Sequence, residues 1–321
     1  MFKKLSKTAA AAAVLSAIVL PAIGPAPASA VSAPLSNART ALHFDLAKDQ
    51  TPENIALGPD GSAYVTFAKA RQVARISPGG TVRTLATLPL PADGGLHTPG
   101  LNFPLTSGIV RAHDGTLYFL YATGTADLTG VWRLRPGGTP QRIAALPPAG
   151  LPNGLALDPR TGTLYVTDSV LGTIWSVPVA GGTPTAWSTA PELAATGFLG
   201  ANGLKIHDGA LWATNLDQGT VLRIPIGRDG RGGPVRTRAT GLTGIDDFAF
   251  TGRGDQILAA LNGPSEVALI QPDGSHSTVL TGADGLQNPT SVTLRGNTVY
   301  VGSAAYVTGK DPNLVLAQLN R

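Results

Sequence analysis

One short pattern recurs six times along the 321-residue chain and restricts the folds that it can adopt. Each copy has a polar residue, a strand of alternating apolar residues, a turn rich in Gly and Asp, and a second β-rich strand. Equivalent apolar residues stand at positions 55, 109, 155, 204, 248 and 292, so the steps are 54, 46, 49, 44 and 44 residues. Blades of four strands need about 40–50 residues each. The repeat therefore predicts an all-β protein, a six-bladed β-propeller.

The second strands of the repeat support this fold class. They follow the first strands at fixed offsets, as in Leu164–Thr167 and Leu211–Thr214. Their alternation has a period of two residues, which indicates strands and not helices. A parallel β-helix is the rival architecture, but its repeats are shorter and lack regular Asp-Gly hairpins.

The last repeat lacks one strand. We expect its three strands at 291–295, 298–303 and 313–319. A β-rich stretch, Ala41–Leu46, precedes the first repeat and has no blade of its own. We expect this stretch to complete the last blade, because such closure removes a free sheet edge.

The N-terminus has the three parts of a secretory signal peptide. A basic region, an apolar core and a small-residue cleavage site follow one another: Lys3, Lys4 and Lys7, then Ala9–Ile23, then Ala28–Ala30. The apolar core is too short to span a bilayer. We therefore expect residues 1–30 to be removed, and residues 31–321 to form a single propeller domain that is secreted and extracellular.

Charge and cysteine content narrow the range of partners. Lys and Arg number 24 against 20 Asp and Glu, but three Lys lie in the signal segment, so the mature chain has 21 against 20 and a net charge of +1. Such a balance gives no support for nucleic-acid binding. With no Cys in the chain, stability must come from the core and not from disulfides. We expect a monomer, without a membrane span, that acts on a small molecule.

The residue two positions before each aligned apolar residue carries oxygen in all six copies. In a propeller this position leads into the innermost strand at the mouth of the central channel, so we expect the six side chains to converge. They are Glu53, Ser107, Asn153, Asn202, Asp246 and Thr290. Ca²⁺ takes about 6–8 oxygen ligands from carboxylates, amides and water, whereas zinc and copper sites usually contain His or Cys. We predict that Ca²⁺, or another hard divalent cation, is bound by Glu53, Asn153, Asn202 and Asp246.

These positions also have a simpler interpretation. Asn-Gly and Asp-Asp pairs are common turn formers and would set the loop that enters each strand. Four matching positions at one register, two of them acidic, favour the metal site. The neighbours Asn54 and Asp247 would then join the ring or support it.

Three stretches resemble the gluconolactonase/senescence-marker-protein (regucalcin) family, and more distantly the paraoxonases and strictosidine-synthase-like proteins. They are Pro152–Ser169, Asn202–Leu204 and Pro52-Glu53. The resemblance spans the mature chain at the level of blades, with short motifs. It implies a six-bladed propeller that holds a divalent cation at the channel floor and hydrolyses lactones or esters.

The same resemblance implies roles for single residues. Glu53 and Asn153 stand where the family has metal ligands in the first and third blades. Asn202 matches the fourth-blade ligand, which is Asn in paraoxonases and Asp in gluconolactonases. Asp246 matches the acidic fifth-blade ligand of paraoxonases.

The general base of these families is missing from its usual place. Asn202 replaces the fourth-blade Asp that gluconolactonases use as the probable base, and Ser107 stands where paraoxonases have a His. A long insertion, 89–103, is expected to lie over the site. Candidate catalytic residues that accept a proton are Asp246, Asp247, Asp168 and, within this insertion, His97.

We therefore expect a calcium-dependent hydrolase of the lactonase or esterase type, in which the cation polarises the carbonyl and activates water. A binding or scaffold propeller with a structural cation is the main alternative, and a lyase acting on a cyclic ester is the third. The insertions 89–104 and 186–200 are expected to form the rim of the site. Apolar residues there favour a hydrophobic lactone or ester: Leu96, Phe103, Phe198 and Leu199.

Overall fold

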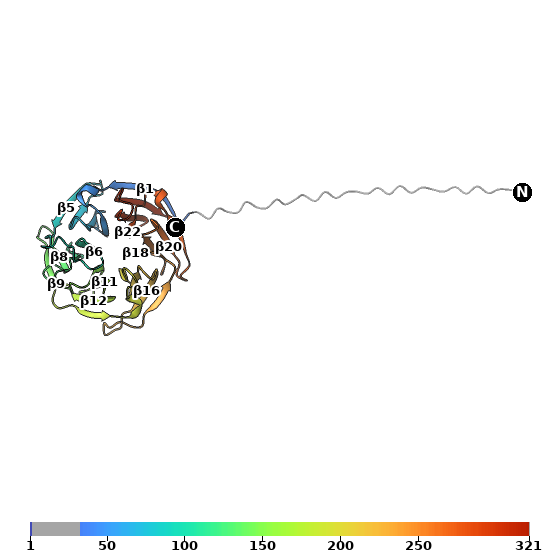
Figure 1. The fold of residues 1–321 in the computed structure, drawn as a ribbon. Helices are drawn as coiled ribbons and strands as arrows, with labels where there is room; N and C mark the ends of the chain where they lie inside the picture. The colour runs from blue at the N-terminus through green and yellow to red at the C-terminus, as the bar shows by residue number, and fades with distance from the viewer. Residues whose placement is uncertain (2–32, 321) are drawn as a thin grey trace. The chain divides into compact units, whose positions relative to one another are not determined.

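The computed structural model describes Met1 and residues 33–320, and the latter form a ring of six four-stranded antiparallel sheets (Figure 1). The innermost strands, such as β6, β18 and β22, surround the axis, and the outer strands form the circumference. This confirms the all-β, six-bladed β-propeller that the repeat predicts. The expected signal segment falls outside the described residues, except for Met1, and stays a prediction.

The first five blades are meanders whose strands pair in chain order. Blade 1 comprises β2 (Pro52–Leu57), β3 (Ala63–Phe67), β4 (Gln72–Ile76) and β5 (Val82–Thr87). Blade 2 comprises β6 (Leu105–Arg111), β7 (Leu117–Ala122), β8 (Gly130–Leu134) and β9 (Gln141–Ala145). Blade 3 comprises β10 (Pro152–Asp158), β11 (Thr163–Asp168), β12 (Thr173–Pro178) and β13 (Thr185–Ser188). Blade 4 comprises β14 (Ala201–His207), β15 (Ala210–Asn215), β16 (Thr220–Pro225) and β17 (Arg236–Ala239). Blade 5 comprises β18 (Ile245–Phe250), β19 (Ile257–Leu261), β20 (Glu266–Ile270) and β21 (His276–Leu280).

Blade 6 joins the two ends of the propeller. It comprises β22 (Pro289–Arg295), β23 (Thr298–Ser303), β24 (Asn313–Leu319) and the N-terminal β1 (Leu35–His43). β1 pairs antiparallel with β24, and Figure 1 shows its blue ribbon beside the red C-terminal strands. The predicted closure by an N-terminal strand is therefore confirmed.

The closing strand lies nearer the N-terminus than Ala41–Leu46, the stretch expected for it. It ends at His43, and Asp45 instead caps the short 3-10 helix η1 (Leu46–Lys48). The Asp45 carboxylate accepts a hydrogen bond from the backbone N–H of Ala47 at 3.0 Å. This local bond competes with strand pairing and ends the strand.

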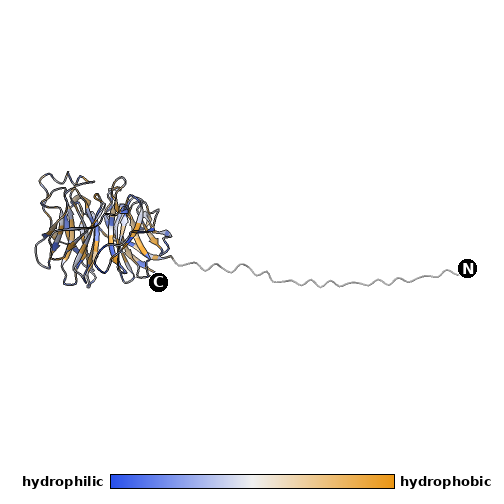
Figure 2. Cartoon of the chain, turned by 90° about the horizontal axis from the view of Figure 1, so that it is seen from below, coloured by the Kyte–Doolittle hydropathy of each residue, from blue (hydrophilic) through white to orange (hydrophobic). Residues whose placement is uncertain are grey.

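Apolar side chains fill each of the six interfaces between neighbouring blades. Figure 2 shows orange, hydrophobic segments within the strands of the propeller. Two further 3-10 helices lie in loops, η2 (Pro191–Leu193) and η3 (Gly282–Asp284). Among the described residues, no helix has the length and apolar character needed to cross a membrane. The packed interfaces hold the six innermost strands in place around the axis.

Candidate metal and catalytic site

Four of the six register residues line one pocket at the mouth of the channel. They are Glu53, Asn153, Asn202 and Asp246, and each is between 2% and 7% exposed. The pocket has a volume of about 260 Å³. Its walls are mainly apolar and come from four blades and the rim loops: Leu101, Phe103, Leu105, Leu151, Phe198, Leu199, Leu216 and Val307. The structure thus brings together the four side chains that the repeat places at one register.

A local irregularity in each innermost strand directs these side chains. The pairing of every innermost strand with its neighbour shifts register at the predicted position. In blade 3, for example, the shift lies between Pro152 and Leu155 and contains Asn153. Such bulges bend a strand and change the direction of a side chain, and they are common beside functional sites. The repeated pattern in the sequence does not reveal them.

The two remaining register residues have another role. Ser107 donates its hydroxyl to the carbonyl oxygen of Pro152 at 2.8 Å, and Thr290 donates to that of Pro52 at 2.9 Å. Both hydroxyls are buried and absent from the pocket lining. The expectation that all six side chains converge on the channel mouth is therefore wrong for these two, because a short hydroxyl side chain reaches the adjacent blade instead. Each one fixes the residue that precedes Asn153 or Glu53.

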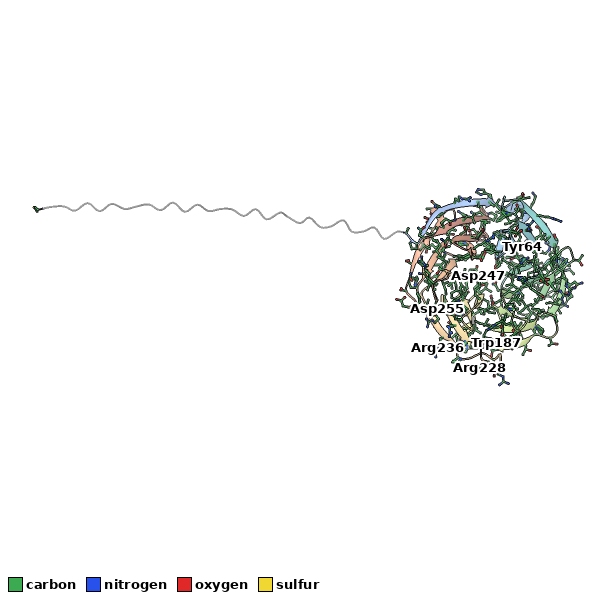
Figure 3. All side chains as sticks on the ribbon, turned by 180° about the vertical axis from the view of Figure 1, so that it is seen from behind. Tyr64, Trp187, Arg228, Arg236, Asp247 and Asp255 are labelled. Carbon is green, nitrogen blue, oxygen red and sulfur yellow. The ribbon has the colours of Figure 1, made fainter. Side chains whose placement is uncertain are left out.

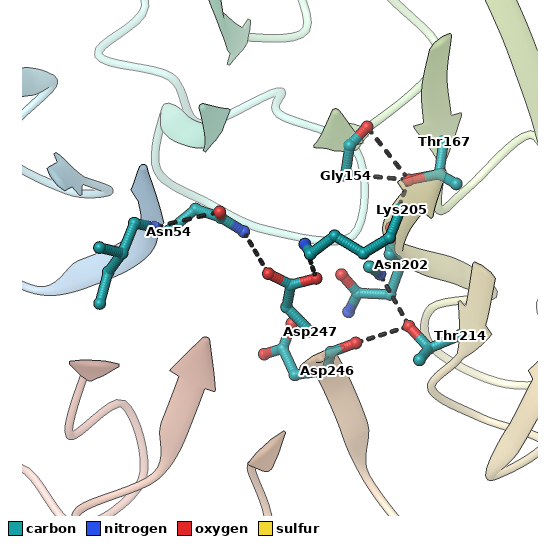
Figure 4. Close-up of polar contacts among 10 residues, drawn as sticks. Asn54, Gly154, Thr167, Asn202, Lys205, Thr214, Asp246 and Asp247 are labelled. Atoms are coloured by element: carbon teal, nitrogen blue, oxygen red, sulfur yellow. Dashed lines mark hydrogen bonds and ion pairs between the residues drawn. The ribbon is translucent and has the colours of Figure 1, made fainter. Parts of the chain in front are cut away.

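Threonines of the second strands also hold the site. Thr214 donates to the carbonyl oxygen of Asp246 at 2.5 Å and accepts the N–H of Gly203 at 2.7 Å (Figure 4). Thr167 makes the equivalent contacts one blade earlier, to the carbonyl oxygen of Asn202 and from the N–H of Gly154. The backbones of Asn202 and Asp246 are thus each bonded to the preceding blade.

The glycines after Asn153 and Asn202 allow this close approach of neighbouring blades. A Cβ atom on Gly203 would lie 2.7 Å from Asp247 Oδ1 and 2.8 Å from the carbonyl oxygen of Asp246. A Cβ atom on Gly154 would collide with the carbonyl oxygen of Asn202. The Asn-Gly pairs are therefore required by packing between blades.

Replacing Gly154 with Ala is expected to lower the free energy of unfolding by about 1–3 kcal/mol, the usual cost of overpacking. It should also weaken binding of a cation at the pocket floor, because Asn202 must move. The matched control is Gly282→Ala, where nothing lies within 4 Å of the added Cβ atom. Urea unfolding and Ca²⁺ titration of both variants measure the effect, and equal behaviour of the two would contradict it.

The two carboxylates of the floor interact unfavourably in this apolar surrounding. Burial raises the pKa of Glu53 to about 7, the charge of Asp247 adds to this, and a hydrogen bond from Tyr306 opposes it. Burial also raises the pKa of Asp246 well above its usual range, and the charges of Glu53 and Asp247 add to the shift. A bound divalent cation would reverse these shifts by favouring the charged forms. The donor set, two carboxylates and two amides, fits a hard cation such as Ca²⁺.

Asp247 lies on the other side of this floor and faces away from the pocket. Its Oδ1 lies 2.5 Å from Lys205 Nζ, and its Oδ2 accepts a hydrogen bond from Asn54 Nδ2 at 3.1 Å. Figure 3 shows Asp247 near the axis, and Figure 4 shows it between these two partners. Asn54 and Lys205 line a hollow of about 650 Å³ at the opposite end of the channel. Asp247 therefore supports the ring and does not face a substrate in the pocket.

His97 is not brought to the pocket. Its side chain is 81% exposed, and its Nδ1 lies 2.7 Å from Asp93 Oδ2. The Asp93 carboxylate also accepts the N–H of His97 at 3.2 Å, which holds this part of the insertion outward. Asp168, the other distant candidate, is buried and uses its Oδ1 to accept the N–H groups of Leu151 and Leu171 at 2.9 and 3.0 Å. Asp246 is thus the one of the four candidates that lines the pocket.

The rim matches the expected insertions in part. Phe103, Phe198 and Leu199 line the pocket, whereas Leu96 is 67% exposed and does not. The carboxylate of Asp217 accepts four backbone N–H groups of residues 196–199 at 2.7–3.2 Å. These bonds fix the loop that carries Phe198 and Leu199.

Three further polar residues line the pocket and were not expected from the sequence: Lys69, Asn262 and Tyr306. Tyr306 donates its hydroxyl to Glu53 Oε2 at 2.5 Å, which orients this carboxylate. All three follow the second strand of their blades, β3, β19 or β23. The ends of second strands meet the starts of first strands at the same mouth, so a polar residue shortly after a second strand is the signal that could have found them, although its distance from the strand end differs among the three.

A separate group of metal-binding side chain types lies in blades 4 and 5, away from the pocket. His207 Nε2 lies 3.5 Å from Asp208 and 3.3 Å from Asp255, which Figure 3 places near the circumference. Arg238 also lies 3.6 Å from Asp255. Because the Arg238 guanidinium already pairs with the Asp255 carboxylate, the cluster of His207, Asp208 and Asp255 is less suited to a metal ion than the pocket floor is.

No family model matches the chain, and no curated protein matches it significantly. Many solved structures share its fold, among them the following three. Regucalcin from Agrobacterium tumefaciens, described as a calcium-binding protein, has a TM-score of 0.63 and 16% identity over 87% of this chain and 94% of that chain. A gluconolactonase from Xanthomonas campestris has a TM-score of 0.60 and 16% identity over 90% of this chain and 96% of that chain. A virginiamycin B lyase from Staphylococcus aureus has a TM-score of 0.61 and 15% identity over 88% of this chain and 99% of that chain.

At these identities the likeness concerns the fold alone. The neighbours include the gluconolactonase and regucalcin propellers that the motifs around Asn153 and Asn202 indicate. The chain therefore has the β-propeller fold that regucalcin and gluconolactonase share.

Proposed function

We propose that this protein is a secreted, calcium-dependent hydrolase of lactones or esters. One observation carries the proposal: Glu53, Asn153, Asn202 and Asp246 converge as an oxygen-rich floor beneath an apolar pocket. A regucalcin described as calcium-binding and a gluconolactonase are among the structural neighbours, and they support this choice of ion and substrate class. The proposal includes export, which the signal pattern in residues 1–30 supports.

The pocket suits hydrolysis of a small neutral carbonyl compound. When bound, Ca²⁺ would supply a Lewis acid that polarises the carbonyl and makes water easier to deprotonate. Asp246 is the residue that we assign as proton acceptor, because its carboxylate lines the pocket, while both oxygens of Asp247 have partners. Tyr306 holds the Glu53 carboxylate in place. Apolar walls such as Phe103 and Phe198 limit access of bulk water.

A non-catalytic binding propeller with a structural cation is the second candidate. The positions of His97 and Asp247 favour it, because two of the residues expected to assist catalysis face away from the pocket. In that case Ca²⁺ would raise the melting temperature, and no ester or lactone would be consumed.

Removing the cation separates these functions. The protein is collected from the culture medium, where the proposed signal cleavage leaves Val31 at the N-terminus. Hydrolysis of a panel of lactones and esters is expected to disappear in EGTA and to return with Ca²⁺, and the melting temperature should fall and rise in parallel. Mass spectrometry identifies the products as a hydroxy acid from a lactone, as a carboxylic acid and an alcohol from an ester or, for a lyase, as an unsaturated compound.

Three results would count against the proposal. Hydrolysis that persists in EGTA excludes a calcium-dependent reaction. A melting temperature that responds to Ca²⁺ without any hydrolysis supports the binding propeller. Retention of the uncleaved chain in the cells contradicts export.

A further inference from the structure

One cationic side chain lines the pocket that has the acidic floor. Lys69 follows β3 and, of the described residues lining the pocket, is the one with a positive charge. Its Nζ lies 5.0 Å from the ring centre of Phe103 and 5.7 Å from that of Tyr306. These two rings are themselves in contact, with centres 6.2 Å apart. The ammonium group is therefore held at the wall of the pocket by aromatic faces.

The ammonium group has no carboxylate partner within the described part of the chain. The lysines at 48 and 205 form ion pairs there, but no ion pair or side-chain hydrogen bond joins Lys69 to another residue. The root of the side chain is fixed, since Phe67 and Ala68 are fully buried and the Lys69 N–H donates to Thr51 Oγ1 at 3.3 Å. A positioned cation that faces a pocket without a partner indicates a ligand with a negative charge.

The charges of the pocket lead to the same conclusion. Two of its residues, Glu53 and Asp246, are acidic, and a divalent cation at the floor would balance both. The charge of Lys69 then remains, so the occupied pocket has one net positive charge. A ligand with one negative charge would neutralise it, and a carboxylate would gain a charge-assisted hydrogen bond from the ammonium group.

The rest of the pocket defines the body of this ligand. Apolar side chains form most of the wall, and the volume of about 260 Å³ lies below the ~300–1,000 Å³ of sites for drug-sized ligands. The pocket therefore accepts a ligand with a short hydrocarbon body.

We propose that Lys69 determines substrate specificity and that the substrates are small, mainly apolar esters or lactones bearing one carboxylate remote from the scissile carbonyl. This inference rests on the proposed hydrolase function. The scissile carbonyl lies at the floor with Glu53 and Asp246, and the free carboxylate pairs with the ammonium group of Lys69. A neutral ester of the same shape fits the pocket without this pair.

A matched pair of esters tests the assignment. Monoethyl glutarate carries one carboxylate, and in ethyl 5-methylhexanoate an isopropyl group takes its place. In the presence of Ca²⁺, the wild-type protein is expected to prefer the anionic ester. The ratio of the two kcat/KM values should fall at least about tenfold in Lys69→Met, mainly through KM. Lys69→Arg should restore much of the ratio, and Lys310→Met, an exposed control, should leave it unchanged.

Binding without turnover gives a second measurement. Isothermal titration should detect hexanoate more readily than 1-hexanol, and Lys69→Met should lose this difference. If Lys69→Met leaves the ratio of kcat/KM values unchanged, the assignment is wrong. It is also wrong if Lys69→Met binds hexanoate as the wild type does, because the carboxylate then binds the metal ion and not Lys69.

The two proposals fail in different ways. If the protein hydrolyses neutral esters but Lys69→Met keeps the wild-type ratio, the role of Lys69 is wrong and the hydrolase stands. If no ester is hydrolysed but hexanoate binds in a manner that depends on Lys69, the hydrolase is wrong and the anion site stands. If neither hydrolysis nor hexanoate binding occurs, both are wrong.

Discussion

Replacing Glu53 with Gln is expected to abolish calcium-dependent hydrolysis and to weaken Ca²⁺ binding by more than about 100-fold. Glu53 is one of two buried carboxylates on the pocket floor, and Gln keeps its size but removes its charge. Residues that merely orient a metal ligand change metal affinity by about 10–100-fold, so the loss of a charged ligand should exceed this range. Calorimetric titration with Ca²⁺ and kcat/KM on a responsive ester measure the two effects.

The same substitution should have the opposite effect on the metal-free protein. Burial raises the pKa of Glu53 to about 7, and Asp247 adds to the shift, which means that the Glu53 charge is unfavourable without a cation. Because Gln removes this charge, Glu53→Gln is expected to raise the melting temperature in EGTA above about pH 7, where Glu53 of the wild type is charged, and to cancel the rise that Ca²⁺ produces in the wild type. Glu266→Gln, which alters a carboxylate of blade 5 outside the pocket, should change neither property.

A destabilised metal-free variant would contradict the unfavourable charge of Glu53 in the absence of a cation. Unchanged Ca²⁺ affinity would remove Glu53 from the ligand set. Glu53→Gln is expected to raise stability without Ca²⁺ and to remove the stabilisation by Ca²⁺. A general loss of structure would lower stability in both conditions and so cannot produce this result.

The repeat predicts the architecture because each blade buries its strands in the same way. Residues such as Val166 and Ala213 occur at one register because each fills an interface between blades. Such apolar residues therefore recur at a regular distance along the sequence. The N-terminal closing strand follows from the missing strand of the last copy. Its ends do not follow, because they depend on a local hydrogen bond of Asp45.

The site is predictable only where it shares the register of the repeat. Glu53 and Asp246 are found in this way, but their common register with Ser107 does not show that the Ser hydroxyl turns to the adjacent blade. Lys69 and Tyr306 follow second strands in loops of different length, so no spacing relates them. His97 was expected over the site because its loop is long, and its pairing with Asp93 is a contact that the pattern does not encode.

Replacing Lys205 with Met is expected to lower the free energy of unfolding by about 1–3 kcal/mol, the usual cost of leaving a buried hydrogen-bonding group without its partner. Lys205 Nζ lies 2.5 Å from Asp247 Oδ1, and the two side chains are 29% and 3% exposed. Met retains the apolar length of Lys but leaves Asp247 with one hydrogen bond, from Asn54. Equilibrium unfolding in urea at neutral pH measures the loss.

The double variant Lys205→Met with Asp247→Asn separates charge from packing. If the loss in Lys205→Met arises from an uncompensated buried carboxylate, removing that carboxylate should restore most of the stability. Lys48→Met is the matched control, because its partner Asp45 forms an exposed pair, and little change is expected. Ca²⁺ should stabilise Lys205→Met more than it stabilises the wild type, since Asp247 also interacts with the charges of Glu53 and Asp246. If Lys205→Met and Lys48→Met unfold at the same urea concentration as the wild type, the Lys205–Asp247 pair does not support the floor of the pocket.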